Sequence, residues 1–505
     1  MCHEGSNGAG VAGAGAGFGG VRGRVDRRQR RYGYHRDELY FLAIGGHPAF
    51  GYDDQPPLVP LLAHAMEAVS GHSLIWLRVP PALAGALIVF VTGLIAREFG
   101  ARRGAQLLAA ATIAVSAILV SASHLDTTTI FDLLIWTDLS LLIIRALGGQ
   151  DKAWLLVGVI AGIGLEIKTL PIFFLFAVAV GLLLVGPRQV FASRMLWAGT
   201  AIAVALWAPN LIWQASHGWP QLHLSAAIAS GSSGTSQPRW LFVPYQGVLI
   251  SPVLVPVWIA GLWRLARARQ LRTWRAFAVA FALLVVVFVA VGGKPYYLCG
   301  MYPVLLAAGS EPTLRWVQRR ATRARAVILG AAIALSAAVS AVLMLPIVPV
   351  SVLHDTPIVA INYDAGEQVG WPAFAATVAH AYRSIPPAQR RYAVVIAANY
   401  GEAGAMHRYR RTIPTYGGQN SYWNLAAPPA DTRTAVIVGY SQTTLRGWFA
   451  TASPIATINN EVDLNNDEQG EQLWLCTGPT AAWATLWARP ATWADDLQVQ
   501  VARLK

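Results

Sequence analysis

The sequence predicts a polytopic α-helical membrane protein with a small α/β domain at its C-terminal end. The 505-residue chain is 55% hydrophobic and contains 19 tryptophans, and its mean hydropathy of +0.44 exceeds what one soluble core requires. Apolar runs long enough to cross a bilayer recur through the first 350 residues. After Val350 the composition changes to a mixed, water-soluble pattern.

The segment 1–33 matches neither part. It is rich in glycine and alanine and then strongly basic, and we expect it to be disordered. It has no run of about 20 apolar residues, and a basic segment resists translocation, yet the order of the later spans puts its neighbour outside. The sequence favours a start site or reading frame that has replaced a true first helix over a genuine soluble extension.

Four carboxylates then gather between residues 34 and 62, within the stretch 34–75 that we predict to be an outer loop. They are Asp37, Glu38, Asp53 and Asp54, in a chain with only 13% charged residues. Pro56, Pro57 and the leucines that follow at helical spacing predict a short amphipathic helix that lies on the membrane surface and ends at Gly71. The acids would then lie at the boundary between lipid and water. A solvated acidic loop without a function is the open alternative.

The region 34–349 contains ten predicted membrane spans. Their approximate ranges are 76–96, 104–122, 128–146, 153–167, 170–186, 195–213, 241–263, 275–292, 295–310 and 326–346. Arginine and lysine gather in the connections after the first, third, fifth, seventh and ninth spans. The positive-inside bias assigns these connections to the cytoplasm and the acidic loop to the outer face. Because the number of spans is even, the domain 350–505 would share that face.

The C-terminal domain 350–505 reads as α/β, with strand-like runs "YAVVIAA" and "TAVIVGY". A strand, a turn and a helix follow one another in "VVIAANYGEAGAMHRY". Ligands of α/β sheets favour the carboxyl ends of strands, so Asn399, Tyr400 and Glu402 are candidate acceptor contacts. The alternative is a tight turn that needs Gly401 and Gly404 for backbone reasons.

Composition argues against nucleic-acid binding and against sites built from cysteine. The net charge of +13 could indicate nucleic-acid binding, but the basic residues lie in short clusters between apolar runs, without an aromatic and basic binding motif. Three scattered cysteines, Cys2, Cys299 and Cys476, predict neither a disulfide framework nor a metal site.

Several motifs resemble, in their order along the chain, the bacterial glycosyltransferase family 39 type, which is related to protein O-mannosyltransferases and lipid A aminoarabinose transferases. The motifs are "RDELYFLAIGGHPAFGYDDQPPLVPLL", "LRVPPALAGAL", "TTTIFDLLIW", "WLLVGVIAGIGLEIKT", "PNLIWQ", "GGKPYYLCGMYPVLLAAG", "NYGEAGA" and "NSYW". The resemblance implies a GT-C fold in the bacterial cytoplasmic membrane. It also implies a polyprenyl-phosphate-linked sugar donor and inverting transfer to a cell-envelope acceptor, a lipid, glycan or protein, at the outer face.

The resemblance also implies roles for individual acids. Asp37 matches the family's catalytic acid and would take the proton from the acceptor, with Glu38 as its neighbour. Asp54 matches an acidic position tied to divalent-metal or phosphate handling, although charge complementarity at a helix start explains it too. Asp132 matches the family's "FD" and would face the cavity. The chain departs from the family at Gln55, where the aminoarabinose transferases carry a lysine, and in the absent first helix.

Basic and aromatic residues on later outer loops are the candidates for binding the donor phosphate. Lys294, with Tyr296 and Tyr297 at a span end, would neutralise the departing polyprenyl phosphate, and Lys168 is a second candidate. Lys294 could instead extend to the membrane interface, and Lys168 could pair with Glu166. Gln55 is the last residue predicted to bind the donor phosphate.

Two other functions stay open at this point. A transporter would place polar groups and broken helices near the bilayer midplane, often in two repeated halves, and neither pattern is visible. A catalytically inactive scaffold or binding protein with the same fold would have the same sequence features, and the missing first helix favours it.

Overall fold

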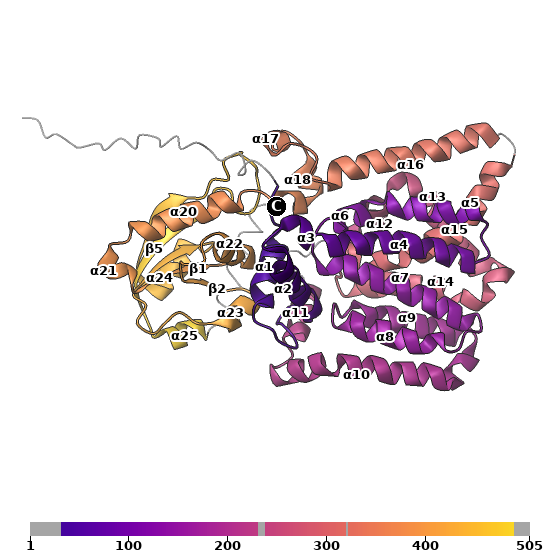
Figure 1. Cartoon of the computed structure of the whole chain (residues 1–505), viewed down its shortest axis with the longest axis horizontal. Coiled ribbons are helices and arrows are strands. Elements are labelled where there is room, and N and C mark those ends of the chain that lie inside the picture. Colours follow the sequence, from indigo (N-terminus) through magenta and orange to yellow (C-terminus); the bar gives the residue numbers. More distant parts are fainter. Residues whose placement is uncertain (1–31, 231–237, 320–321, 489–505) are drawn as a thin grey trace, which may run out of the picture.

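The computed structural model describes residues 32–230, 238–319 and 322–488, so the segment predicted to be disordered lies almost wholly outside the described residues. Figure 1 shows two parts side by side, a bundle of long helices and a smaller domain with a sheet, with α1 and α2 between them. The polytopic helical fold with a small α/β domain is thus confirmed.

The N-terminal stretch is more helical than predicted. The helix α1 (Arg36–Gly45) occupies part of the expected loop, because His35 caps its start and Glu38 completes a capping box. The predicted helix after Pro57 is confirmed as α2 (Leu58–Ser70), and its position on the membrane surface stays a prediction. It ends at Gly71, whose φ of 60° suits a glycine in the left-handed region. A short helix, α3 (Leu74–Leu77), leads into the bundle.

A helix or a pair of helices stands at each of the ten predicted spans. They are α4 (Val79–Glu98), α5 (Arg103–Ala114), α6 (Ala117–Ala122), α7 (Thr128–Leu147), α8 (Ala153–Leu165), α9 (Leu170–Val185), α10 (Arg194–Ser216), α12 (Phe242–Ile250), α13 (Val255–Arg267), α14 (Ala276–Ala290), α15 (Tyr302–Gln318) and α16 (Thr322–Met344). The outer helix α11 (Pro220–Ala229) and the 3-10 turns η1 (Arg188–Ala192), η2 (Arg239–Leu241), η3 (Pro252–Leu254), η4 (Arg269–Trp274) and η5 (Pro295–Met301) connect them.

Not every predicted span is a long helix. By length and composition, three helical stretches of the described chain can cross a membrane: Leu74–Glu98, Arg194–Ser216 and Arg323–Met344. A fourth results if Arg239–Ile250 and Pro252–Arg267, bent by 87°, count as one span. The helices α8, α9 and α14 have 13, 16 and 15 residues, which is short for a bilayer crossed at 1.5 Å per residue.

Glycines allow the closest helix contacts in the bundle. A Cβ atom built on Gly261 would lie 1.8 Å from the Leu305 carbonyl oxygen, and one on Gly309 would lie 1.9 Å from the Val257 oxygen. Small residues let helix backbones approach in a membrane, where contact rather than the hydrophobic effect holds helices together. These two glycines therefore fix α13 against α15.

The C-terminal domain is a five-stranded mixed sheet in the order β2-β1-β3-β5-β4. The two predicted strands are confirmed as β1 (Ala393–Ala397) and β3 (Thr434–Val438), which pair in parallel. The sequence did not predict β2 (Thr415–Gly417), β4 (Phe449–Thr457) and β5 (Gln472–Pro479). The strand β2 is parallel to β1, whereas β5 is antiparallel to both β3 and β4.

Helices cover both faces of this sheet. Alternate residues of β1 point to opposite sides, so Val395 packs in the core shared with α20 (Trp371–Ser384) and α22 (Tyr400–Tyr409). Ile396 packs in a second core with α24 (Gln442–Trp448) and α25 (Trp483–Trp487). The remaining helices are short: α17 (Val350–Leu353), α18 (Ile358–Ile361), α19 (Tyr363–Gly366), α21 (Pro387–Arg390) and α23 (Ser421–Leu425).

Candidate active site

The first turn of α1 separates the two adjacent acids. The His35 ring accepts from the Asp37 backbone N–H at 3.2 Å, and Glu38 Oε2 accepts from the His35 backbone N–H at 2.8 Å. This capping box directs the Glu38 side chain back to the helix start. The Asp37 side chain keeps 31% of its surface exposed.

Glu38 has a structural place, which argues against the prediction that it shares in catalysis. Its carboxylate is fully buried and pairs with Arg78 through two bonds of 2.8 Å each. It also accepts from the Asp126 backbone N–H at 3.1 Å. A buried carboxylate with these partners cannot reach an acceptor, so its role is to join α1 to the bundle.

Asp37 meets the C-terminal domain. The Tyr400 hydroxyl donates to Asp37 Oδ1 at 2.8 Å, and the Arg36 guanidinium lies 3.9 Å from the same oxygen. Arg36 is held between the rings of Tyr363 and Tyr400, at 5.1 and 5.3 Å, and pairs with Glu367 at 3.4 Å. These contacts hold one oxygen of a carboxylate whose side chain stays partly exposed.

Two lysines stand near Asp37. Lys168, in the turn between α8 and α9, places its ammonium 5.0 Å from the Tyr296 ring and 5.5 Å from the Tyr297 ring. Burial, together with the charges of Lys168 and Arg36, lowers the pKa of Lys294 to about 8, and Asp37 opposes the shift. Burial also lowers the pKa of Lys168, against the effects of Asp132 and Asp37. The structure thus brings Asp37, Lys168, Lys294 and the two tyrosines together.

These lysines carry charges that the described residues leave unpaired. No described carboxylate lies within 4.0 Å of either ammonium group, and the expected alternative pair of Lys168 with Glu166 does not form. Half-buried cations in a low-dielectric setting attract an anion more strongly than cations in water. The pair is therefore suited to a phosphate.

Asp54 already has hydrogen-bond partners within the protein. The Tyr40 hydroxyl donates to Asp54 Oδ1 at 2.6 Å, and the Asn420 amide donates to its second oxygen at 3.3 Å. Burial raises the pKa of Asp54 to about 7, and the Tyr40 hydrogen bond opposes the shift. Asp53 contacts the same domain, since its oxygen accepts from the Asn424 amide at 2.6 Å.

These residues do not fit the expected divalent metal. Across residues 32–230, 238–319 and 322–488, no three His, Cys, Asp or Glu side chains are arranged to hold an ion. A lone carboxylate with a raised pKa and two protein partners is a poor ligand for a hard cation. No step is therefore assigned to a metal.

Gln55 is a buried amide in the turn before α2. Its side chain is 7% exposed, and its Nε2 atom has no hydrogen-bond partner among the described residues. The Leu58 backbone N–H donates to the Glu166 carbonyl at 3.0 Å, which ties this turn to the one that carries Lys168. Gln55 thus keeps a free donor in a turn whose helix is tied to the turn of Lys168.

Two of the three predicted acceptor contacts are capping residues. The Asn399 side chain accepts from the backbone N–H of Gly401 at 2.6 Å, and Glu402 Oε2 accepts from the Asn399 backbone N–H at 3.1 Å. Glu402 is fully buried. Both side chains are used to start α22, which favours a capping role over the predicted acceptor contacts of Asn399 and Glu402. Tyr400, between them, faces Asp37.

Replacement of Asn399 by alanine is expected to lower the free energy of unfolding by about 0.5 to 2 kcal/mol, the cost of a lost helix cap. Chemical denaturation of the full chain in detergent measures this. The matched control is Ser441→Ala, which removes the cap of α24 in the same domain, away from Asp37. A change in acceptor KM with Asn399→Ala alone, without a loss of stability, would return Asn399 to the site.

The contacts between the C-terminal domain and the acidic stretch were not predicted from the sequence. Tyr40 accepts from the Ser421 backbone N–H at 3.1 Å and packs against the rings of Tyr400 and Tyr422 at 4.8 and 5.7 Å. The Ser421 hydroxyl accepts from the Asp53 backbone N–H at 2.9 Å. The motif "GGQNSYW" carried the signal, since it offers many polar and aromatic groups, but the sequence did not reveal their partners.

Known proteins resemble this chain in the sequence of one segment and in the fold. Residues 54–213 match the family model described as dolichyl-phosphate-mannose-protein mannosyltransferase. The structure is similar to the crystal structure of ArnT from Cupriavidus metallidurans in the apo state, with a TM-score of 0.61, 13% identity, and coverage of 88% of this chain and 94% of that chain. The same protein bound to undecaprenyl phosphate gives a TM-score of 0.59, 14% identity and the same coverage of 88% and 94%.

A comparison with curated protein sequences gives no match. At such low sequence identities the structural likeness is evidence for the fold alone. The family model is evidence for the family of residues 54–213. The resemblance seen in the motifs is confirmed over residues 54–213, which match the mannosyltransferase family model, and the structural likeness shows that the chain shares the fold of ArnT.

Proposed function

We propose that the chain is an inverting glycosyltransferase that moves a sugar from a polyprenyl-phosphate donor to a cell-envelope acceptor, with Asp37 as the general base. One observation carries the proposal. A partly exposed carboxylate, Asp37, shares a site with two lysines that no described carboxylate neutralises. The family match and the ArnT structure with undecaprenyl phosphate support a lipid-linked phosphate as the anion.

The residues suit each step of the transfer. Asp37 takes the proton from the acceptor hydroxyl or amine, whose freed electron pair forms the new bond to the anomeric carbon of the sugar. The bond from that carbon to the phosphate oxygen breaks, and its electrons leave with the polyprenyl phosphate. Lys168 and Lys294 would stabilise the charge that develops on the phosphate, with Gln55 as an added donor. Attack opposite the leaving group inverts the anomeric centre.

Tyr400 is the positioning residue for the base. Its hydroxyl donates to Asp37 at 2.8 Å from the C-terminal domain, so docking of that domain orients the carboxylate. The same domain packs against the acidic stretch (Figure 1). We infer that it helps to hold the acceptor near Asp37, although through groups other than Asn399 and Glu402.

We place the reaction at the outer face of the bacterial cytoplasmic membrane. The basic connections alternate with sparsely charged ones, which puts Asp37 outside by the positive-inside bias. The C-terminal domain must share the side of Asp37, because Tyr400 contacts it. Lipids of the membrane and a lipid-linked sugar are the expected partners, and nucleic acid is not.

The experiment that tests the proposal is a donor assay in proteoliposomes. Full-length protein is supplied with polyprenyl-phosphate sugars carrying a labelled hexose or pentose, and water-soluble label is followed over time. We expect release of sugar that depends on Asp37. Intact donor with every sugar would favour an inactive scaffold, and solute flux without donor cleavage would favour a transporter.

Donor binding is expected to weaken as pH rises above about 8. The donor phosphate is a diester with no proton to titrate near neutral pH, so the change comes from Lys294, whose pKa burial lowers to about 8. Its ammonium is charged below that value, where the affinity is fully present, and neutral above it. Equilibrium Kd values from about pH 6.5 to about pH 9.5 measure the effect, which approaches tenfold per pH unit.

The matched variant for this pH effect is Lys294→Arg, because a guanidinium stays charged throughout the range. Its Kd should vary little with pH. An equally steep loss of affinity in Lys294→Arg would assign the titration to another group and remove Lys294 from the explanation.

A further inference from the structure

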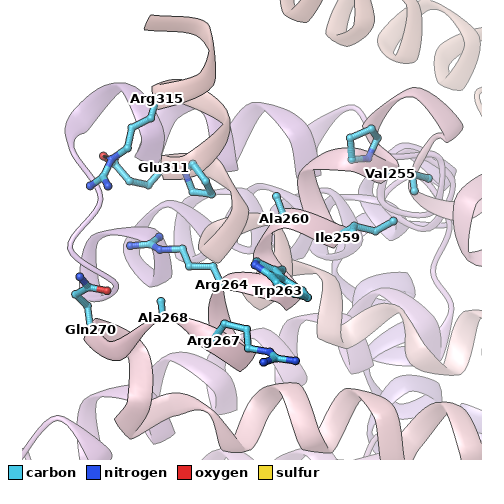
Figure 2. Close-up of a pocket in the computed structure, with 12 residues that line it drawn as sticks. Val255, Ile259, Ala260, Trp263, Arg264, Arg267, Ala268, Gln270, Glu311 and Arg315 are labelled. Carbon is cyan, nitrogen blue, oxygen red and sulfur yellow. Dashed lines mark hydrogen bonds and ion pairs between the residues drawn. The ribbon is translucent and has the colours of Figure 1, made fainter. Parts of the chain in front are cut away.

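A cavity of about 800 Å³ lies between α13 and α15, away from Asp37 (Figure 2). This volume falls in the usual range for small-molecule sites, roughly 300 to 1,000 Å³. The chain leaves the cavity through η4 and enters α14 at Ala276, and α14 ends at Ala290 shortly before Lys294. The 15 residues of α14 therefore separate the cavity from the site of Asp37 by roughly 20 Å.

The two ends of the cavity differ in character. Figure 2 shows Val255, Ile259 and Ala260 toward one end, and Arg264, Gln270 and Arg315 toward the other. The side chains of Ile259 and Trp263 are 49% and 65% exposed, which is typical of residues that face lipid in a membrane protein. An apolar wall that leads to a cluster of arginines suits an amphiphile.

The charges at the polar end do not balance. The one carboxylate that lines the cavity, Glu311, is 2% exposed and pairs with Arg315 at 2.9 Å and with Arg102 at 3.4 Å. Arg264 instead donates to neutral carbonyl oxygens, those of Ala308 at 3.0 Å and Phe99 at 3.2 Å. A buried acid shared by two arginines leaves the polar end with a net positive charge.

Arg267 adds a second uncompensated cation. Its guanidinium stands over the Trp263 ring at 5.1 Å, and it makes no ion pair among the described residues. Arginine forms paired, charge-assisted bonds with phosphate oxygens, and these are stronger than bonds between neutral groups. Arg264 and Arg267 can therefore receive an anionic group without losing an existing ion pair.

We propose that this cavity binds an anionic phospholipid of the surrounding membrane, with the phosphate at Arg264 and Arg267 and an acyl chain along the wall from Trp263 to Val255. Basic pockets between transmembrane helices on the cytoplasmic side are known to suit such head groups. The positive-inside bias puts the connection after α13 on that side. The apolar wall favours a lipid over a free anion, because a free anion gains nothing from it.

The test uses the full-length protein in a neutral detergent and fluorescent phosphatidylglycerol as the probe. Arg267 is exposed and bonded to no carboxylate, so Arg267→Gln should fold and should weaken phosphatidylglycerol binding by about tenfold or more. The double variant Arg264→Gln/Arg267→Gln should lose roughly a hundredfold if both arginines hold the phosphate. The matched control is Arg269→Gln, which removes an exposed arginine two residues away that does not line the cavity.

Phosphatidylcholine with the same chains should bind at least about tenfold more weakly, and inorganic phosphate should displace the probe poorly. Equal binding of the two lipids would overturn the proposal, as would an equal loss in Arg269→Gln and Arg267→Gln. Displacement by inorganic phosphate at low concentration would make this a site for a soluble anion, and preference for polyprenyl phosphate would make it a substrate site. Each result is read without sugar transfer, so it stands apart from the proposed enzyme activity.

Discussion

Replacement of Asp37 by asparagine is expected to lower sugar transfer by roughly 10²- to 10⁴-fold, while the protein still inserts and binds donor. Asparagine keeps the shape of the side chain and can accept from Tyr400, but it lacks the basic oxygen that takes the acceptor proton. Initial rates with saturating donor, together with an equilibrium donor Kd, separate chemistry from binding. A fall in kcat with an unchanged Kd is the expected pattern.

The control for this variant is Asp355→Asn. Its carboxylate side chain is 71% exposed and lies outside the site, so transfer should stay near normal. The variant Glu38→Gln is not a suitable control, since it breaks the buried pair with Arg78 and would lower stability. Near-normal turnover in Asp37→Asn would remove Asp37 from the role of base.

Replacement of Lys294 by alanine should weaken donor binding by about 1.5 to 3 kcal/mol, the value of a charge-assisted hydrogen bond to phosphate. The loss corresponds to roughly 10- to 150-fold in Kd. Lys294→Arg should recover part of the affinity below the pKa of the native lysine. Titration of the protein with a fluorescent polyprenyl-phosphate sugar measures the change.

The matched control is Lys152→Ala, which removes an exposed lysine from the connection between α7 and α8. Its Kd should not change. If Lys294→Ala and Lys294→Arg both bind donor as tightly as the native chain, Lys294 only anchors its loop at the membrane interface.

The parts of the fold that the sequence predicted are those with a strong local signal. Apolar length located the helices at the ten predicted spans, and the mostly apolar runs of β1 and β3 were visible because helices cover both faces of the sheet. The strand β4 was not predicted, since most of its residues are exposed and small or polar. The helix α1 was missed because its start is a histidine cap, an uncommon signal.

The sequence pointed to the residues of the site but did not show which role each one has. Asp37 and Glu38 are neighbours with the same chemistry, and only Arg78, forty residues later, decides which of them is buried. In the same way Asn399 and Glu402 form a capping pair, whose spacing of three residues was present in the sequence. Tyr400 could not be linked to Asp37 from the sequence, because 363 residues separate them.

The most direct test of the account is to locate the lipid phosphate on the chain. A polyprenyl phosphate with a photoreactive group next to the phosphate is crosslinked to the protein in proteoliposomes, and the labelled peptides are identified by mass spectrometry. If Lys168 and Lys294 bind the phosphate, label is expected on the turn from Glu166 to Thr169 and on the segment from Lys294 to Met301. Label confined to other parts of the chain, such as the cavity wall from Val255 to Gln270, would contradict it.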